Sequence, residues 1–504
     1  MNKIIDLDSL AVIVEDIRSQ GRTVVLCHGT FDLLHIGHIR YLRQAKGFGD
    51  VLIATISPDR FVDKGPNRPA FTESLRAEML ASLSIVDYVA INQWPTAEST
   101  LRLLRPDYYV KGADFKNVEN DPTGKLSLEQ NVADRIGTKL VFTDDVVYSS
   151  SNLINKHLDI YPQELAEYLS LLRQRHNLAD VLAFLDEMSD LKVLVVGDAI
   201  IDDYTFCRPL GLSSKDPTLA LRRLSSEQFP GGALAVARHI AGLTKNVTLC
   251  TMFGGNCQYQ ALIKRSLPPE IELIYELVPD APTVRKHRYL DGYSLNKFIE
   301  IYDMGDESPP ARVEKAMAER LEAIIENYDL VLAADFGHGA IGEMAIEVLC
   351  RKAKFLAVNT QANAGNRYFH TIFRYPRADF VSLAGHELEL AYQDRKTMTY
   401  NLMLDLFNRL NLSTLIITAG AEGLKALDKN DYVHTPAVAV RTVDRVGAGD
   451  ALFAVSALAA QLGCPLELIG LMGNIAGAHL VSSVGNDSAI NIQGIKKTLT
   501  AMMK

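Results

Sequence analysis

The chain has 504 residues, more than a single hydrophobic core usually serves, so its length predicts two or three domains. Apolar residues make up 48% of it and charged residues 22%, an ordinary globular composition that argues against long disordered or fibrous regions. The formal net charge is −9 and no basic cluster stands out, so we expect no nucleic-acid partner.

The cysteines and the N-terminus exclude further classes of protein. The six cysteines form neither a CxxC pair nor a Cys/His array, so we expect reduced thiols rather than disulfides or structural zinc. The first 20 residues carry interspersed acids without an apolar signal core, which is typical of an amphipathic helix. No apolar run approaches the ~18–20 residues that a membrane span needs. We therefore expect a cytoplasmic protein without a membrane partner.

Strands and helices are predicted to alternate along most of the chain. In the first 155 residues a helix is predicted at 75–83, and strands at 23–27, 50–57, 88–93, 108–112 and 139–143. This alternation favours a Rossmann-like parallel sheet. Residues 156–190 are highly charged with helical periodicity and predict a helical connector. Alternation resumes with the strand KVLVVGDAIID at 192–202 and ends in long helices rich in small residues. We predict two α/β domains, at 1–155 and 191–504.

The first chemical motif is HGTFDLLHIGH at 28–38, directly after a buried strand. A glycine turn followed by a helix start aims backbone N–H groups at an anion. His35 and His38 stand three residues apart near that helix start, so both can face one phosphate and stabilise charge during in-line displacement at phosphorus. The motif therefore predicts nucleotidyl transfer with these histidines as catalytic residues. The predicted nucleotide-binding residues of the turn are Gly29, Thr30 and Phe31.

Residues 20–155 resemble the cytidylyltransferase-like superfamily. The likeness runs on through DVLIATISPDRFVDKGPNRPAFTESLRAEMLASL, YVKGADF (109–115) and YSSSNLIN (148–155). It implies that Arg76, Lys111 and Asp114 line the nucleotide or acceptor site, the alternative for Arg76 being a solvated charge on its helix. The family has a threonine-containing, triphosphate-binding phrase where this chain has serines. They are candidate phosphate ligands, with helix capping as the alternative: Ser149, Ser150 and Ser151.

The second motif is DRVGAGDALFA at 444–454. Glycines immediately before an apolar helix let backbone amides approach a phosphate closely. An aspartate at the helix start can accept the proton of an attacking hydroxyl. Asp450 is therefore the predicted catalytic base, unless it only caps the helix. The predicted phosphate-binding residues are Gly447, Ala448 and Gly449.

With FPGGALAVARHIAGL (229–243) and LIITAGAEGLKAL, this motif resembles the ribokinase-like (PfkB) carbohydrate kinases over about 191–490. The resemblance implies a ribokinase-like fold with Asp450 as the base. Glu387 belongs to a phrase linked to magnesium and phosphate, and is the candidate metal ligand. The resemblance implies sugar binding by Asp198, Asp202, Gly231 and Gly232.

This chain departs from that family's pattern at three single positions and in one three-residue phrase. A base, an anion-binding turn and one acid remain, so kinase chemistry is still expected, with the acceptor bound differently from the best-matched relatives. Ala235 replaces an asparagine, His338 replaces a lysine, Ala384 replaces the amide of N-x-x-E, and Asn359-Thr360-Gln361 replaces D-P-K.

Both halves together resemble the bifunctional ADP-heptose synthases, with the two domains in reverse order. The resemblance implies a sugar-phosphate kinase and a sugar-1-phosphate nucleotidyltransferase, which make a nucleotide-activated sugar for surface lipopolysaccharide. It implies ATP or CTP as co-substrate, Mg²⁺ as cofactor, a sugar phosphate as partner and a homo-oligomeric assembly. Two alternatives stay open: a CTP-dependent cytidylyltransferase for glycerol or another polyol phosphate, and a degraded kinase domain that only binds its ligand.

Overall fold

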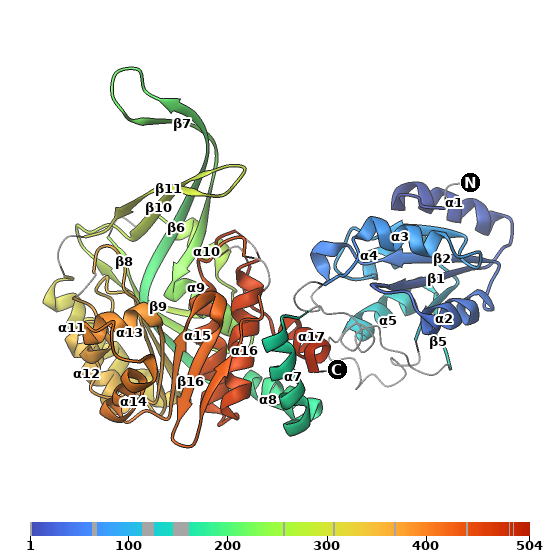
Figure 1. The fold of residues 1–504 in the computed structure, drawn as a ribbon. Coiled ribbons are helices and arrows are strands. Elements are labelled where there is room, and N and C mark those ends of the chain that lie inside the picture. Colours follow the sequence, from blue (N-terminus) through green and yellow to red (C-terminus); the bar gives the residue numbers. More distant parts are fainter. Residues whose placement is uncertain are drawn as a thin grey trace. The chain divides into compact units, whose positions relative to one another are not determined.

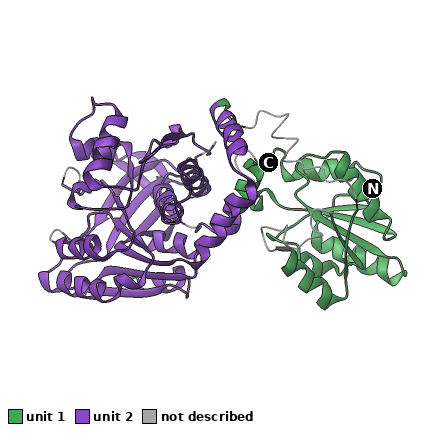
Figure 2. Ribbon diagram, turned by 90° about the horizontal axis from the view of Figure 1, so that it is seen from below, with its two compact units in different colours: residues 1–163, 496–504 green, residues 164–495 purple. Residues whose placement is uncertain are grey.

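The computed structural model describes residues 3–62, 68–112, 125–144, 161–255, 258–305, 308–366, 369–439, 442–482, 484–486 and 488–503. The chain forms two compact units, residues 1–163 with 496–504 and residues 164–495 (Figures 1 and 2). Each unit has its own β-sheet. Throughout these described ranges, no helix combines the length and apolar character that crossing a membrane requires.

The first unit contains a five-stranded parallel sheet in the order β3-β2-β1-β4-β5. The Rossmann-like sheet predicted from the sequence is confirmed. Its strands are β1 (Val24–Gly29), β2 (Val51–Ile56), β3 (Tyr88–Ile91), β4 (Tyr108–Lys111) and β5 (Lys139–Phe142). Its helices include α1 (Leu7–Ser19), α2 (Ile36–Lys46), α3 (Glu73–Ala81), α4 (Glu98–Leu104) and α5 (Lys125–Ile136).

Strand β1 is apolar on both faces because helices cover both sides of the sheet. Val24 and Leu26 pack in the cluster formed with α1 and α4. Val25 and Cys27 point the other way, into the cluster formed with α2 and α3. The strand order reverses between β1 and β4, so their carboxyl ends border the crevice in which open α/β sheets bind ligands.

The second unit contains a larger, mixed sheet. Its main path is β11-β10-β6-β12-β13-β14-β15-β16-β17, with β7 and β8 also paired to β6 and β9 paired to β8. The strands are β6 (Lys192–Leu212), β7 (Leu219–Gly232), β8 (Asn246–Gly254), β9 (Glu272–Val278), β10 (Val284–Asp291), β11 (Lys297–Asp303), β12 (Leu330–Asp335), β13 (Leu356–Thr360), β14 (Phe380–Ala384), β15 (Thr414–Thr418), β16 (Leu424–Asp428) and β17 (Tyr432–Thr435).

Helices cover both faces of the central parallel strands. Alternate residues of β6, β12, β13 and β14 pack with α11, α12 and α14 in one large buried cluster, whereas α9 and α15 contact the same strands from outside that cluster. The helices from residue 163 onward are α7 (Gln163–Arg175), α8 (Leu178–Glu187), α9 (Ala233–Ala241), α10 (Gln260–Ser266), α11 (Ala311–Ile324), α12 (Glu343–Lys352), α13 (Gly385–Tyr392), α14 (Thr399–Leu410), α15 (Ala448–Gln461), α16 (Leu466–Leu480) and α17 (Ile492–Met503).

The segment predicted as a connector contains α7 and α8, and its first residues, 156–160, lie outside the described residues. Helix α7 is tied to α16 by polar contacts. Tyr168 donates a hydrogen bond from its hydroxyl to the carbonyl oxygen of Glu467 over 2.8 Å. His176 Nε2 lies 3.0 Å from Oε1 of the same residue. These contacts attach α7 to the second unit.

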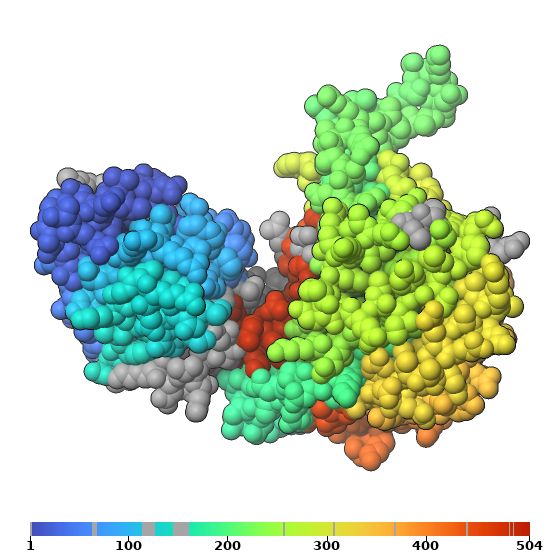
Figure 3. Space-filling view, turned by 180° about the vertical axis from the view of Figure 1, so that it is seen from behind, coloured from blue at the N-terminus to red at the C-terminus, as the bar shows by residue number. Residues whose placement is uncertain are grey.

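Strand β6 is much longer than the strand predicted at 192–202. Its first part pairs in parallel with β8 and β12, and from Ala199 onward it pairs antiparallel with β7. We call β7, β10, β11 and this second part of β6 the outer layer. Beyond Cys207 the β6–β7 hairpin is exposed and projects from the second unit as an arm (Figures 1 and 3). The predicted strand stopped short because the residues that follow lack a continuous apolar pattern.

Candidate active sites

The histidine motif lies at the carboxyl end of β1. His35 is the N-cap of α2, where its Nδ1 accepts a hydrogen bond from the backbone N–H of Gly37 over 3.1 Å. The ring centroids of His35 and His38 are 4.1 Å apart. Burial lowers the pKa of His35, which favours its neutral form. The structure therefore brings the two predicted catalytic histidines together at a helix N-terminus, a position suited to an anion.

The predicted nucleotide-binding turn joins β1 to this helix. Gly29 is the last residue of β1, and Phe31 adopts a φ of 48°, a left-handed conformation that a bulky residue seldom takes. The ring of Phe31 is buried, with its centroid 5.3 Å from that of His38. Thr30 presents its carbonyl oxygen to the guanidinium of Arg76. The turn is thus held in one shape by packing and by a buried cation.

Arg76 does not line an open site, nor is it a solvated charge on its helix. Its side chain is fully buried. Its guanidinium donates to the carbonyl oxygens of Phe71 and Ser57 over 3.0 and 2.8 Å and to Asp59 over 2.6 Å, in addition to Thr30. A group with these buried bonds holds the ends of β1 and β2 in place. The expected direct contact with nucleotide is corrected to a positioning role.

Lys111 ends β4 and lies 2.8 Å, measured from Nζ to Oε2, from Glu129 of α5. The same carboxylate oxygen accepts a hydrogen bond from Tyr109 over 2.9 Å. Burial has the largest single effect and raises the pKa of Glu129. The charge of Lys111 and further contacts lower it and together outweigh burial, so the pKa lies below its ordinary value. Nucleotide binding by Lys111 stays a prediction, and Asp114, Ser149, Ser150 and Ser151 lie outside the described residues.

A buried ion pair beside the motif was not predicted. Asp32 accepts a hydrogen bond from Arg68 Nη1 over 3.0 Å, and both side chains are almost fully buried. The second carboxylate oxygen of Asp32 accepts the backbone N–H of Ala70 over 2.6 Å. Asp32 thus fastens the segment after residue 67 to the motif. The GTFD phrase contains Asp32 and the NRP phrase contains Arg68. The sequence did not reveal their contact because the two residues are 36 positions apart.

In the second unit, Asp450 lies in the first turn of α15. The N-cap is Gly447, with a φ of 83°, and within the described residues no backbone N–H bonds the carboxylate of Asp450. Its Oδ1 instead accepts a hydrogen bond from Nε2 of Gln361 over 2.7 Å. The alternative in which Asp450 only caps its helix is therefore wrong. A Cβ on Gly447 would collide with the side-chain amide of Asn486, so the turn requires glycine.

The environment of Asp450 suits a general base. Burial and, second, the negative charge of Asp202 raise the pKa of Asp450 to about 7. The hydrogen bond from Gln361 and the positive charge of Lys286 act in the opposite direction. A base with a pKa near the working pH combines a useful deprotonated fraction with enough basicity to accept a proton. Next to it, Ala448 and Gly449 open α15 and present their amides at its N-terminus.

The predicted sugar-binding residues divide into two groups. Asp202, on β6, forms an ion pair with Arg288 and lies against Gly231, where a Cβ would collide with its carboxylate. Gly232 adopts a φ of 57° between β7 and α9. Asp198 is instead surrounded by the backbone N–H groups of the loop after β12. Its carboxylate accepts hydrogen bonds from residues 336, 338 and 340 over 2.9, 3.2 and 2.9 Å.

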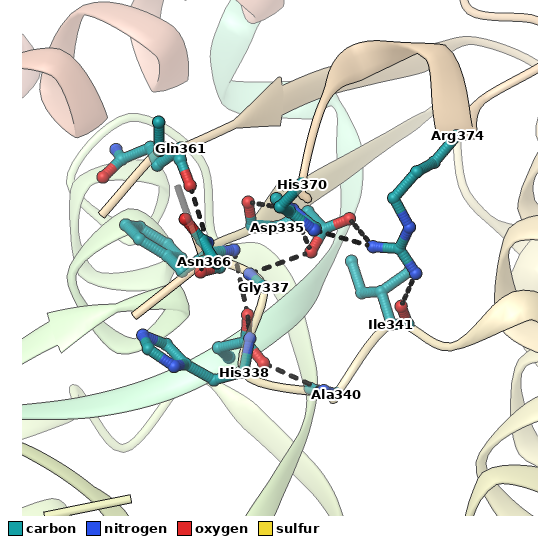
Figure 4. A network of polar contacts seen from close by, with 12 residues as sticks. Asp335, Gly337, His338, Ala340, Ile341, Gln361, Asn366, His370 and Arg374 are labelled. Carbon is teal, nitrogen blue, oxygen red and sulfur yellow. Dashed lines mark hydrogen bonds and ion pairs between the residues drawn. The ribbon is translucent and has the colours of Figure 1, made fainter. Parts of the chain in front are cut away.

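That loop is fixed by a polar network that the sequence did not reveal (Figure 4). Asp335 accepts a hydrogen bond from Arg374 over 3.0 Å and lies 3.0 Å from His370. Asn366 donates to the carbonyl oxygens of Phe336 and Gln361. The imidazole of His338 points away from the Asp335 carboxylate (Figure 4). The network thus holds the loop that carries His338. Through Asn366 it also bonds Gln361, the residue that donates to Asp450.

Glu387, the candidate metal ligand, has its carboxylate engaged by the backbone. Its two oxygens accept the N–H groups of Ala362 and Ala384 over 3.0 and 2.7 Å, and burial raises its pKa. Across the described part of the chain, no three His, Cys, Asp or Glu side chains gather as a metal site. The expectation of a metal site built on Glu387 is therefore not supported. A Mg²⁺ ion fits this region only where substrate phosphates and water supply most ligands, which is its usual mode.

Comparison with known proteins identifies both units. Residues 26–156 match the cytidylyltransferase-like family, and residues 190–492 match the pfkB family of carbohydrate kinases. Among curated proteins, the bifunctional protein HldE of Syntrophotalea carbinolica is 36% identical over 159 residues, covering 31% of each chain. That of Campylobacter fetus is 41% identical over 157 residues, again 31% of each. The chain thus spans about a third of the length of these relatives.

A solved structure supports the fold of the second unit. Phosphofructokinase-2 from Escherichia coli, in complex with potassium, superposes with a TM-score of 0.52 at 15% identity, covering 62% of this chain and 99% of that one. The ribokinase-like fold predicted for the second domain is confirmed. This chain therefore belongs to the pfkB family of carbohydrate kinases, with a cytidylyltransferase-like domain ahead of the kinase domain, the reverse of the order in the HldE proteins.

Proposed function

We propose that this chain is a bifunctional enzyme with two activities. The second unit phosphorylates a sugar phosphate at C1, which gives a sugar bisphosphate. A separate phosphatase must then remove the other phosphate group with water, and the first unit transfers a nucleotidyl group to the remaining sugar 1-phosphate. The product is a nucleotide-activated sugar of the ADP-heptose kind for surface lipopolysaccharide. The support is the occurrence of both family matches in one chain, together with the similarity to bifunctional HldE proteins.

The observation that carries the kinase proposal is the state of Asp450. Its carboxylate is buried, is not consumed in capping, and has a pKa near neutrality. In the proposed step Asp450 takes the proton of the acceptor hydroxyl as that oxygen bonds to the γ-phosphorus of ATP. The bond from this phosphorus to the bridging oxygen breaks, and ADP leaves. The amides of residues 447–449 face the negative charge that develops on the phosphoryl oxygens.

The proposed transferase step uses the histidine pair. A phosphate oxygen of the sugar 1-phosphate attacks the α-phosphorus of ATP or CTP, and pyrophosphate leaves. His35 and His38, at the N-terminus of α2, donate hydrogen bonds to charge that develops on the phosphate oxygens. Arg76 keeps Thr30 and the ends of β1 and β2 in register for this geometry. Mg²⁺ carried on the nucleotide phosphates would offset charge in both reactions.

A homo-oligomer is the assembly we propose, and the arm is the surface that supports it. Four leucines on the β6–β7 arm are between 43% and 71% exposed, which is unusual for large apolar side chains grouped on one hairpin. A second copy of the same chain would cover them through a two-fold contact. The residues are Leu210, Leu212, Leu219 and Leu224.

One experiment tests both activities. Purified chain is incubated with ATP or CTP and a panel of sugar, sugar-phosphate and polyol-phosphate acceptors, while ADP formation and pyrophosphate release are followed separately. We expect ADP with a sugar monophosphate and pyrophosphate with a sugar 1-phosphate. Pyrophosphate release only with CTP and a polyol phosphate, without any ADP, would replace this proposal by that of a cytidylyltransferase with a ligand-binding second unit.

A further inference from the structure

Strand β10 presents two different faces. Lys286, Arg288 and Leu290 are buried, while the residues between them are half-buried on the opposite face. Lys286 pairs in register with Asp202 of β6 and with Tyr302 of β11, so these three side chains share the inner face of the outer layer. This is the face that carries the carboxylate of Asp202, next to Gly231. The buried cations of β10 therefore belong to the acceptor side of the proposed kinase site.

The charges on this face are matched, with one exception. Arg288 bonds both Asp202 and Glu300, the latter over 2.7 Å. Lys297 bonds Asp444 over 2.9 Å. Lys286 forms neither an ion pair nor a hydrogen bond with any residue that the structure describes, although it is only 7% exposed. Its ammonium nitrogen instead lies over two aromatic rings.

Those rings are Tyr302, with its centroid 5.4 Å from Nζ, and Phe336, at 5.8 Å. Such contacts offset only part of the cost of removing an ammonium group from water. Burial accordingly lowers the pKa of Lys286 despite the nearby charges of Asp202, Asp450 and Asp198, which raise it. A buried cation that folding leaves unpaired, beside a candidate catalytic base, is arranged to receive an anion.

His338 offers a second polar group on the same side. It lies two residues after Phe336, and its Nε2 is buried without a hydrogen-bond partner in the described chain. Burial, and then the charge of Lys286, lower the pKa of His338 to about 4, so its imidazole is neutral at pH 7 and carries one N–H donor. Because the ammonium nitrogen of Lys286 lies over the ring of Phe336, two residues before His338, both groups belong to the surroundings of the same loop.

We propose that Lys286 binds the phosphate group of the acceptor, with His338 as a second donor, and that this contact selects sugar phosphates over neutral sugars. This inference rests on the proposed kinase function. An acceptor phosphate is favoured over the γ-phosphate of ATP because the elements that surround Lys286 are β6, β11 and the Phe336 loop. Lys286 also pairs in register with Asp202, whose carboxylate adjoins Gly231, and both of these are among the predicted sugar-binding residues.

The test compares full-length wild-type protein with Lys286→Met and Lys286→Arg, and with Lys352→Met as the control. Lys352 lies on α12 in the same unit, where it pairs with Glu322 at the surface. Calorimetric titration without ATP uses hexose and heptose monophosphates and the same sugars without phosphate. We expect Lys286→Met to weaken binding of the monophosphate that wild type prefers by about 10–100-fold, the range of a charge-assisted hydrogen bond. Binding of neutral sugars should not change, and Lys286→Arg should recover part of the loss.

Several results would overturn the inference. In the first, monophosphates bind wild-type protein no more tightly than neutral sugars do. In the second, Lys286→Met binds the monophosphate as tightly as wild type does. In the third, Lys286→Met keeps its affinity for the monophosphate and only its kcat is reduced. The last result would assign Lys286 to the γ-phosphate instead. The proposed function fails separately: if Lys286 controls monophosphate binding but wild type transfers no phosphate from ATP, the subsite stands and the kinase proposal falls. If wild-type protein phosphorylates a neutral sugar at a rate that Lys286→Met does not change, the kinase proposal stands and the subsite falls.

Discussion

Gln361 donates a hydrogen bond from Nε2 to Oδ1 of Asp450 across 2.7 Å, joining the end of β13 to the first turn of α15. The amide does not titrate, so it can bond Oδ1 at every pH, and it leaves Oδ2 for the acceptor hydroxyl of the proposed reaction. Gln361 stands in the Asn359-Thr360-Gln361 phrase, where the family pattern has D-P-K. One of the departures from that pattern therefore supports the candidate base.

Replacing Asp450 by Asn should remove kinase activity and leave the transferase reaction intact. Asn keeps the shape and can accept the same bond from Gln361, but it cannot take up the hydroxyl proton. The expected loss is about 10²–10⁴-fold in kcat, the usual contribution of a general base. ADP formation measures the first activity, and pyrophosphate release from supplied sugar 1-phosphate measures the second. Equal kinase rates for the variant and wild type would remove Asp450 from the mechanism.

The kinase rate should rise with pH through about 7, because only the deprotonated form of Asp450 accepts a proton and its pKa is raised to about 7. Gln361→Leu removes a hydrogen bond that lowers this pKa. The rising limb of the kcat–pH profile should therefore move to higher pH in the variant. Gln493→Leu, on α17, is a control for the loss of an amide elsewhere. A shift toward lower pH would contradict the assigned direction.

Asp450→Asn should also stabilise the second unit above neutral pH. The folded-state pKa of Asp450 is raised from 3.8 to about 7, so the native protein keeps a proton that the unfolded chain loses between those values. Stability from this group is complete below about pH 4 and is lost as pH rises through 7. The gain from Asn should grow over the same range, to at most about 4 kcal/mol. Calorimetric unfolding at pH 5 and pH 8 measures it, and a larger gain at pH 5 would refute the sign.

Replacing His35 or His38 by Ala should reduce kcat for pyrophosphate release by about 10²–10³-fold, as for loss of an oxyanion-hole donor. His35 also caps α2, so its loss to Ala combines a catalytic with a structural effect. His35→Asn restores a capping acceptor and separates the two. If it recovers stability without recovering rate, the imidazole acts in the chemistry. A double Ala variant with nearly normal kcat would exclude both residues.

Arg76→Leu should destabilise the first unit by about 3–5 kcal/mol, because it leaves buried acceptors and the carboxylate of Asp59 without their cation. The chain has a single tryptophan, Trp94, which packs against the core of the first unit. Its fluorescence during urea unfolding therefore reports on that unit. Arg102→Leu, on the exposed side of α4, is the matched control. Equal urea midpoints for the two variants would show that Arg76 does not stabilise the first unit in this way.

Local sequence was sufficient where a motif and its backbone act together. The apolar strand before HGTFD predicted β1 and the turn that follows it, and the glycines before Asp450 predicted the helix that begins there. Arg76 was different, because a charged residue within a helical pattern does not reveal that it points inward. Gln361 and Lys286 were missed because their roles depend on distant residues. Gln361 bonds Asp450, 89 residues later, and Lys286 lies in register with Asp202, 84 residues earlier, without bonding it. The cationic run Arg285–Arg288 in an otherwise ordinary strand was the available signal for Lys286.

Strand β6 belongs to two layers at once, since Val193–Gly197 pairs with β12 and Ala199–Leu212 pairs with β7. A continuous backbone cannot slip past itself, so the outer layer cannot translate freely over the central sheet. Asp198 occupies the junction between the two pairing regions and bonds the Phe336–Ala340 loop. The same strand therefore connects the arm, the inner face of the outer layer and the loop that carries His338 through one continuous backbone.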